Sequence, residues 1–174
     1  MKASLIIIGN EILSGRTQDK NLSYLANWLN EIGIQLTEVR VIRDEEDVIV
    51  ETVNHLRKTY DYVFTTGGIG PTHDDITSES IAKAFSVDLE INQGALSILK
   101  EYYKDGELTE ARMKMTKMPV GSELIENPVS RAPGFKMGNV FVLAGIPGIM
   151  QGMVEGARQF LKNCLLYTSP SPRD

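Results

Sequence analysis

The segment between Thr66 and Thr77 combines residue types that suit the binding of a phosphate group. It follows a short apolar run and has glycine at three of four consecutive positions: Gly67, Gly68 and Gly70. Glycine lets the backbone turn sharply and approach a ligand, and the free N–H groups of such a turn form an anion site with the start of the next helix. The spacing matches neither the P-loop nor the dinucleotide-binding glycine motif. The segment therefore predicts a phosphate site of another kind.

Two adjacent aspartates, Asp74 and Asp75, lie between these glycines and a helix expected to start near Thr77. Carboxylates at this position could hold a divalent cation that also binds phosphate oxygens. A plain tight turn in which Asp75 or Thr77 caps the helix is the alternative. The two aspartates and the neighbouring His73 are more than a cap requires, so the pattern favours a binding site.

Polar residues also follow two other expected strands. Asn10 and Glu11 come directly after the apolar run Leu5–Ile8, and Asp44 follows the run Leu36–Ile42. Ligands of open α/β sheets bind at the carboxyl ends of the strands. We therefore expect these side chains to converge beside the glycine segment, although ordinary helix-start electrostatics is an alternative for Asp44.

A loop rich in proline and glycine, Asn127–Phe135, adds two further candidates. Ser130 and Arg131 could contact phosphate, because a guanidinium matches the geometry of a phosphate group. A solvated surface charge is the alternative for Arg131.

The elements that must position these residues alternate between apolar runs and amphipathic helices. We expect strands at Leu5–Ile8, Leu36–Ile42 and Tyr62–Thr65, and helices at Asp19–Ile32, Glu45–Lys58 and from Thr77 to about Phe85. Strands that alternate with helices in this way predict the α/β class, with a mainly parallel sheet covered on both faces.

The second half of the chain is less regular. We expect a helical stretch from Asn92 to Met118, broken near Asp105-Gly106, and a final helix from about Pro147 to Lys162. Between them, Phe135–Leu143 contains Gly138-Asn139 and predicts a small β-hairpin, because both central residues can take a positive φ. The prolines near the C-terminus fit neither helix nor central strand. We therefore expect a domain in residues 1–163, truncated on its C-terminal side, and a non-native or disordered tail in residues 164–174.

Composition excludes several functional classes. The chain has 174 residues, of which 42% are hydrophobic, and its 18 basic and 23 acidic residues give a net charge of −5. With no basic stripe, nucleic-acid binding is not expected. With no apolar run near the roughly 20 residues of a membrane span, we expect a cytoplasmic protein that does not enter membranes. One cysteine and two histidines exclude an intrachain disulfide and a His/Cys zinc cluster, so any metal would be a hard cation.

Five motifs in order, Gly9–Gly15, Asp19–Asn21, Val41–Asp44, Thr66–Thr77 and Ala132–Phe135, resemble the MoaB/Mog (molybdopterin-binding) domain superfamily. Within it, they are most similar to the amino-terminal domain of CinA proteins. The resemblance implies a three-layer α/β/α domain, dimeric or trimeric, with a pocket at the strand ends. CinA-type relatives are associated with metal-dependent hydrolysis of nucleotide diphosphate compounds such as ADP-ribose. A related domain is associated with hydrolysis of FAD. Other relatives are associated with adenylylation of molybdopterin.

Carried onto this sequence, the resemblance implies phosphate binding by the glycine loop, with Asp75 as the acidic residue of that loop. Asp44 matches the acidic position after the second strand, and Asn10 and Glu11 match the CinA-type signature. The loop departs from many relatives in having Ile69 where they have threonine, which removes one hydroxyl from the expected ligand site.

We therefore expect a nucleotide pyrophosphatase, in which Asp75 and Asp44 are catalytic. Mg²⁺, Mn²⁺ or Co²⁺ would be held by Asp75, Asp74 and Glu11. The substrate would contact Gly67, Gly68, Gly70, Thr66, Thr77, Asn10 and Ser130. The alternatives are a molybdopterin adenylyltransferase and a non-catalytic module that binds a pterin or nucleotide.

Overall fold

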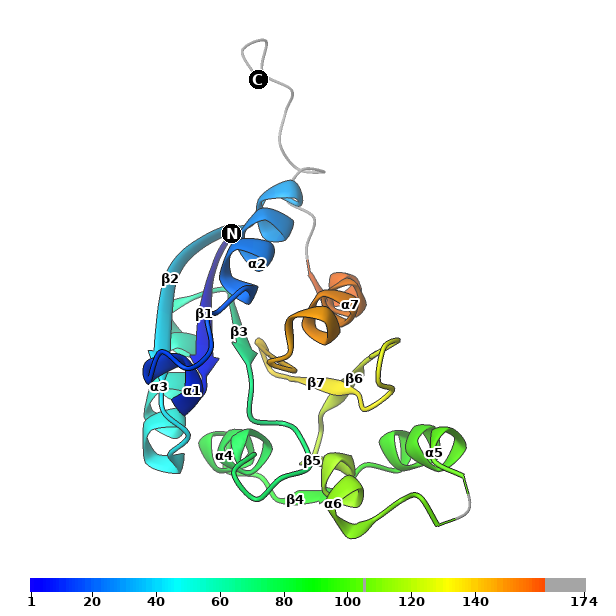
Figure 1. The fold of residues 1–174 in the computed structure, drawn as a ribbon. Helices are drawn as coiled ribbons and strands as arrows, with labels where there is room; N and C mark the ends of the chain where they lie inside the picture. Colours follow the sequence, from blue (N-terminus) through cyan, green and yellow to red (C-terminus); the bar gives the residue numbers. More distant parts are fainter. Residues whose placement is uncertain (105, 162–174) are drawn as a thin grey trace.

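The computed structural model describes residues 1–104 and 106–161 (Figure 1). Its main sheet has six strands in the order β2-β1-β3-β8-β7-β6. These strands are β1 (Lys2–Ile8), β2 (Gln35–Ile42), β3 (Tyr62–Thr66), β6 (Glu123–Ile125), β7 (Gly134–Met137) and β8 (Val140–Leu143). The pairs β2-β1, β1-β3 and β3-β8 are parallel, whereas β8-β7 and β7-β6 are antiparallel. The expected mainly parallel sheet is confirmed.

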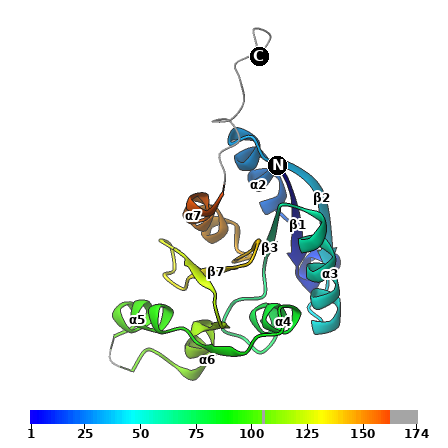
Figure 2. The same cartoon turned by 180° about the vertical axis from the view of Figure 1, so that it is seen from behind.

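Helices cover both faces of this sheet. Alternate side chains of β1 accordingly pack in two different hydrophobic cores, one on each face. Leu5 and Ile7 pack in the core formed with α2 (Asn21–Glu31) and α7 (Pro147–Ala157). Ile6 and Ile8 pack in the opposite core. That second core is formed with α3 (Glu46–Thr59) and α4 (Thr77–Ala84). Figures 1 and 2 show α2 and α7 on one side of the strands and α3 on the other. The three-layer α/β/α architecture is thus confirmed.

The segment between α4 and β6 forms a small annex to the main sheet. It contains α5 (Gln93–Tyr102), α6 (Glu110–Met113), a 3-10 turn at Lys114–Thr116, and a two-stranded antiparallel sheet of β4 (Leu89–Ile91) and β5 (Lys117–Pro119). In Figures 1 and 2 these elements lie together beyond the end of β3. The predicted helical stretch at Asn92–Met118, broken near Asp105-Gly106, is therefore only partly correct, since it ends in β5.

Other boundaries differ modestly from those expected. A short helix, α1 (Asn10–Leu13), follows β1, and α7 ends at Ala157 before a 3-10 turn at Arg158–Phe160. The expected end of the last helix at Lys162 and the expected tail at 164–174 lie outside the described residues. Within the described ranges, no helix combines the length and apolar character needed to span a membrane.

The expected hairpin joins β7 to β8 and is confirmed, with Met137 paired to Val140. Of its two central residues only Gly138 takes a positive φ, 58°. The side-chain nitrogen of Asn139 instead donates to the carbonyls of Arg57 and Tyr60, each at 3.0 Å. Asn139 therefore fastens the hairpin to the end of α3, a tertiary role that the turn motif does not reveal.

Candidate functional site

A pocket of about 680 Å³ lies at the carboxyl ends of β1, β3 and β8. Four regions line it: the segment after β1, the glycine loop after β3, the annex, and the loops on either side of the hairpin. Its volume lies within the range of about 300–1,000 Å³ typical of small-molecule sites. The pocket is therefore located where open α/β sheets bind ligands.

The glycine loop requires glycine at its first two positions. Gly67 and Gly68 have φ values of 99° and 76°, in the region that side chains rarely adopt. A Cβ atom on Gly67 would lie 2.2 Å from the carbonyl oxygen of Ile8, and one on Gly68 would lie 2.0 Å from Oγ1 of Thr77. Both glycines line the pocket, as does Gly70. The loop is thus packed tightly from behind while its other side faces the pocket.

Thr77 and Thr66 lie behind the loop, although the sequence suggested that both contact the substrate. The buried Thr77 hydroxyl donates to the carbonyl of Gly67 at 2.9 Å, and its backbone N–H donates to Gly68 at 2.9 Å. Thr66 is 1% exposed and faces a second cavity of about 50 Å³. Neither residue lines the larger pocket. In this conformation, Thr77 supports the loop from behind.

Two of the predicted acidic residues, Glu11 and Asp75, line the pocket together with the glycine loop. Oδ2 of Asp75 accepts hydrogen bonds from the backbone N–H of Thr72 at 2.9 Å and from its hydroxyl at 2.8 Å. The ammonium group of Lys114 donates to the backbone carbonyls of Asp75, at 2.6 Å, and Thr72. Thr72 therefore orients the Asp75 carboxylate, and Lys114 links the backbone of this loop to the annex.

Asp44 and Asn10 form a reciprocal pair outside the pocket lining. The N–H of Asn10 donates to Oδ2 of Asp44 at 3.0 Å, and the N–H of Asp44 donates to Oδ1 of Asn10 at 3.1 Å. Burial raises the pKa of Asp44, and the charges of Glu11, Asp75 and Asp74 raise it further, against the lowering effect of the bond from Asn10. The predicted acids thus gather at one edge of the sheet, close enough to affect one another.

Asp74 itself points into solvent, with its side chain 79% exposed and 3.2 Å from His73. Across residues 1–104 and 106–161, no three His, Cys, Asp or Glu side chains form a group that could hold a metal ion. The metal-binding role of Asp75, Asp74 and Glu11 therefore stays a prediction. It would require oxygen atoms from the ligand to complete the coordination.

The loop after β6 places Ser130 in the pocket wall and Arg131 outside it. Asn127, which is 2% exposed, donates from Nδ2 to Oγ of Ser130 at 2.7 Å and to the carbonyl of Ala132 at 2.8 Å. Arg131 instead approaches Glu126 at 3.8 Å. The loop is therefore organised by a buried asparagine, and Asn127, Ser130 and Ala132 all line the pocket.

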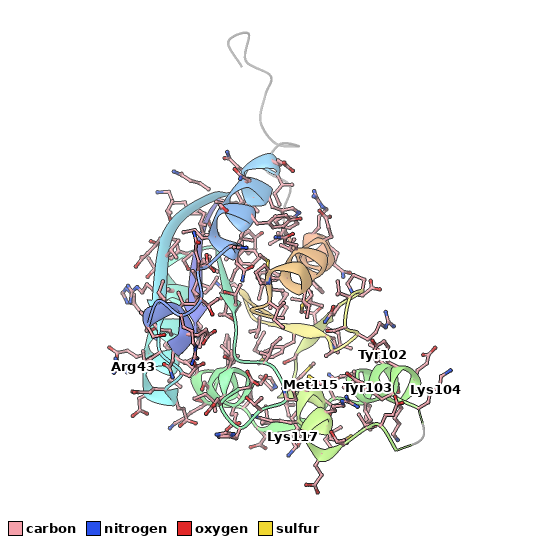
Figure 3. The ribbon with its side chains drawn as sticks, in the orientation of Figure 1. Arg43, Tyr102, Tyr103, Lys104, Met115 and Lys117 are labelled. Atoms are coloured by element: carbon pink, nitrogen blue, oxygen red, sulfur yellow. The ribbon has the colours of Figure 1, made fainter. Side chains whose placement is uncertain are left out.

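The annex contributes three lining residues that the sequence did not single out as ligand contacts: Tyr103, Arg112 and Met115. Figure 3 labels Tyr103, which directly follows α5, and Met115, which lies in the 3-10 turn after α6. Cζ of Arg112 lies 4.3 Å from the centre of the Tyr103 ring. No local motif marks these residues, because only the fold of the annex brings them to the pocket.

Comparison with known proteins agrees with this architecture. The family model described as a probable molybdopterin binding domain matches residues 4–163. The structure of CinA from Thermoplasma acidophilum, a protein of unknown function, superimposes with a TM-score of 0.84 at 37% identity, covering 92% of this chain and 98% of that one. The molybdopterin biosynthesis enzyme MoaB from Thermus thermophilus shares the fold alone, with a TM-score of 0.61 at 16% identity, covering 95% and 94% of the two chains.

Longer relatives match over most of this chain. A CinA-like protein from Kosmotoga olearia is 36% identical over 97% of this chain and 43% of its own length. Protein Ta0487 from Thermoplasma acidophilum is 38% identical over 88% of this chain and 61% of its own length. The chain thus spans less than two thirds of the length of these relatives. With a family model that matches nearly the whole described region, the chain belongs to the MoaB/Mog molybdopterin-binding domain family and is of the CinA type.

Proposed function

We propose that this domain binds a nucleotide diphosphate compound, such as ADP-ribose or FAD, and hydrolyses its diphosphate bond with the help of a divalent cation. One observation carries the proposal: the carboxylates of Glu11 and Asp75 line the same pocket as the glycine loop. A phosphate-binding backbone and carboxylates in one pocket are the combination that metal-assisted phosphate chemistry requires.

The donor set is compatible with a hard cation that binds together with its substrate. Mg²⁺ is commonly held by one or two carboxylates plus substrate phosphates, and here Glu11 and Asp75 would supply the carboxylates. Burial is the main cause of the raised pKa of Asp44, and the negative charges of Glu11, Asp75 and Asp74 raise it further. A bound cation would neutralise phosphate charge and lower the pKa of a bound water molecule.

The chain's own groups would perform the other tasks. The N–H groups of the Gly67–Gly70 loop would bind the phosphate oxygens, and Thr77 would keep that loop in place through its bond to Gly67. Thr72 orients Asp75 through two hydrogen bonds. In the reaction, the oxygen of water bonds to one phosphorus and the bond from that phosphorus to the bridging oxygen breaks, which gives two phosphate monoesters.

The test is an assay of ADP-ribose and FAD with Mg²⁺, Mn²⁺ or Co²⁺, with detection of the monoester products. We expect turnover by the wild type and a loss of at least about 100-fold in Asp75→Asn, because an acid group essential to metal chemistry is removed. Asp88→Asn is the matched control, since Asp88 is exposed and lies outside the pocket lining. Equal activity in Asp75→Asn and the control would refute the proposal.

Adenylylation of molybdopterin is a second candidate, favoured by the description of the matching family model as a molybdopterin binding domain. The same loop could hold the phosphates of ATP. Transfer of AMP to molybdopterin, without hydrolysis of ADP-ribose or FAD, would establish this function instead. Ligand-dependent thermal stabilisation without any turnover would indicate a non-catalytic binding module, because binding alone stabilises the folded state.

A further inference from the structure

We propose that Arg112 binds the anionic part of the ligand in this pocket, so that the domain selects phosphorylated ligands over neutral nucleosides and pterins. The inference rests on the proposed function only in taking this pocket as the ligand site, and it does not require that the ligand be hydrolysed.

The charges of the pocket give the first argument. Among the lining residues in the described part of the chain, the ionisable acids are Glu11 and Asp75, and Arg112 is the one Lys or Arg. A diphosphate entering this space meets two carboxylates in a partly desolvated environment, where repulsion between like charges is stronger than in water. Arg112 is therefore the lining side chain that can compensate for the ligand's negative charge.

The geometry of Arg112 gives the second argument. Its guanidinium stacks on the ring of Tyr103 at 4.3 Å, and Nη1 donates to the carbonyl of Glu107 at 2.6 Å. The backbone N–H of Arg112 is also capped by the hydroxyl of Thr109 at 3.2 Å. Because the bond to Glu107 uses Nη1, the edge formed by Nε and Nη2 is available to two phosphate oxygens. A guanidinium fixed in this way loses little freedom when a ligand binds.

Two other cationic side chains near the pocket, Lys114 and Arg131, have different partners. Lys114 directs its ammonium group to the carbonyls of Thr72 and Asp75, and so supports the loop. Arg131 lies outside the lining and approaches Glu126. This leaves Arg112 as the group to test, and it makes Arg131 a matched control of the same residue type.

The experiment measures calorimetric binding of ADP-ribose, inorganic pyrophosphate and adenosine, without metal, to the full chain and to three variants: Arg112→Met, Arg112→Lys and Arg131→Met. We expect Arg112→Met to weaken binding of ADP-ribose and pyrophosphate by about tenfold or more, the effect of losing a charge-assisted hydrogen bond. Arg112→Lys should retain part of the affinity, since the charge remains without the planar fork. Adenosine binding should change in none of the variants, and Arg131→Met should match the wild type throughout.

Equal affinities of Arg112→Met and Arg131→Met for pyrophosphate would overturn the inference, as would wild-type protein that binds neither anionic probe. An equal loss of adenosine and pyrophosphate binding in Arg112→Met would assign Arg112 a structural role and also overturn it. If Arg112→Met does not fold, the comparison of Arg112→Lys with the wild type decides. Arg112-dependent binding without hydrolysis would refute the proposed function alone, whereas hydrolysis with an unchanged KM in Arg112→Met would refute this inference alone.

Discussion

Substitution of Gly68 by alanine tests the claim that the glycine loop is fixed from behind. Two costs are expected. The φ of 76° is unfavourable for alanine by about 1–2 kcal/mol. The added Cβ would also lie 2.0 Å from Oγ1 of the buried Thr77, and forced overpacking of this kind costs about 1–3 kcal/mol. The total loss of unfolding free energy is thus about 2–5 kcal/mol.

Gly15→Ala separates the two costs. Gly15 has a φ of 79°, close to that of Gly68, but a Cβ at this position would meet nothing within 4 Å. We expect Gly15→Ala to lose about 1–2 kcal/mol of unfolding free energy, because only the cost of the positive φ applies there. The difference between the two variants, measured by urea unfolding, then gives the cost of the clash.

A double variant identifies the clashing partner. Thr77→Ala alone removes the hydrogen bond to Gly67 and should cost about 1 kcal/mol. In Gly68→Ala/Thr77→Ala the hydroxyl that obstructs the new Cβ is gone, so the combined loss should be smaller than the sum of the single losses. If Gly68→Ala loses no more stability than Gly15→Ala, or if the losses simply add, the proposed packing behind the loop is wrong.

Three further predictions concern the polar side chains of Asp44, Glu155 and Thr66. Burial and neighbouring acids raise the pKa of Asp44 above its ordinary 3.8. The protonated carboxyl therefore stabilises the fold at low pH, and this stabilisation is lost as pH rises through the folded pKa. Asp44→Asn should have a higher Tm than wild type at pH 7, and the same Tm at a pH below the unfolded pKa. Hydrogen bonds from Arg158 and Trp28 lower the pKa of Glu155 below 4.5. Glu155→Gln should therefore have a lower Tm at pH 7, with a deficit that shrinks as pH falls through the folded pKa. The Thr66 hydroxyl is buried without a protein partner in the described region, so Thr66→Val should leave the unfolding free energy measured in urea unchanged or raise it. A fall of about 1 kcal/mol or more would contradict this.

Much of the layered fold could be predicted because its elements carry strong periodic signals. The continuous apolar run of β1 fits a strand buried on both faces, and the apolar spacing in α2 and α3 fits one buried helix face each. The glycines of the loop were also identifiable, since their positive φ values explain why no other residue type fits. Strands β4, β5 and β6 were missed, because three residues are too few for alternation to be recognised.

The candidate site was only partly predictable, for a different reason. Strand order brings the chain segments to one edge of the sheet, but the sequence does not say which way each side chain points there. Thr77 was expected to bind ligand, yet its hydroxyl bonds to Gly67 behind the loop, and Asp44 bonds to Asn10 beside the pocket. Such orientations depend on local hydrogen bonds that a motif does not encode.

By itself, the sequence determined the layered α/β fold, the glycine loop and the family, because these depend on periodicity and on conformational preferences within short segments. Only the tertiary structure decided the composition of the pocket. Arg112 and Tyr103 come to line the same pocket as the glycine loop through the packing of the annex, although they lie more than thirty residues further along the chain. Contacts between such distant segments arise from the way the helices and strands pack in three dimensions, which no local pattern records.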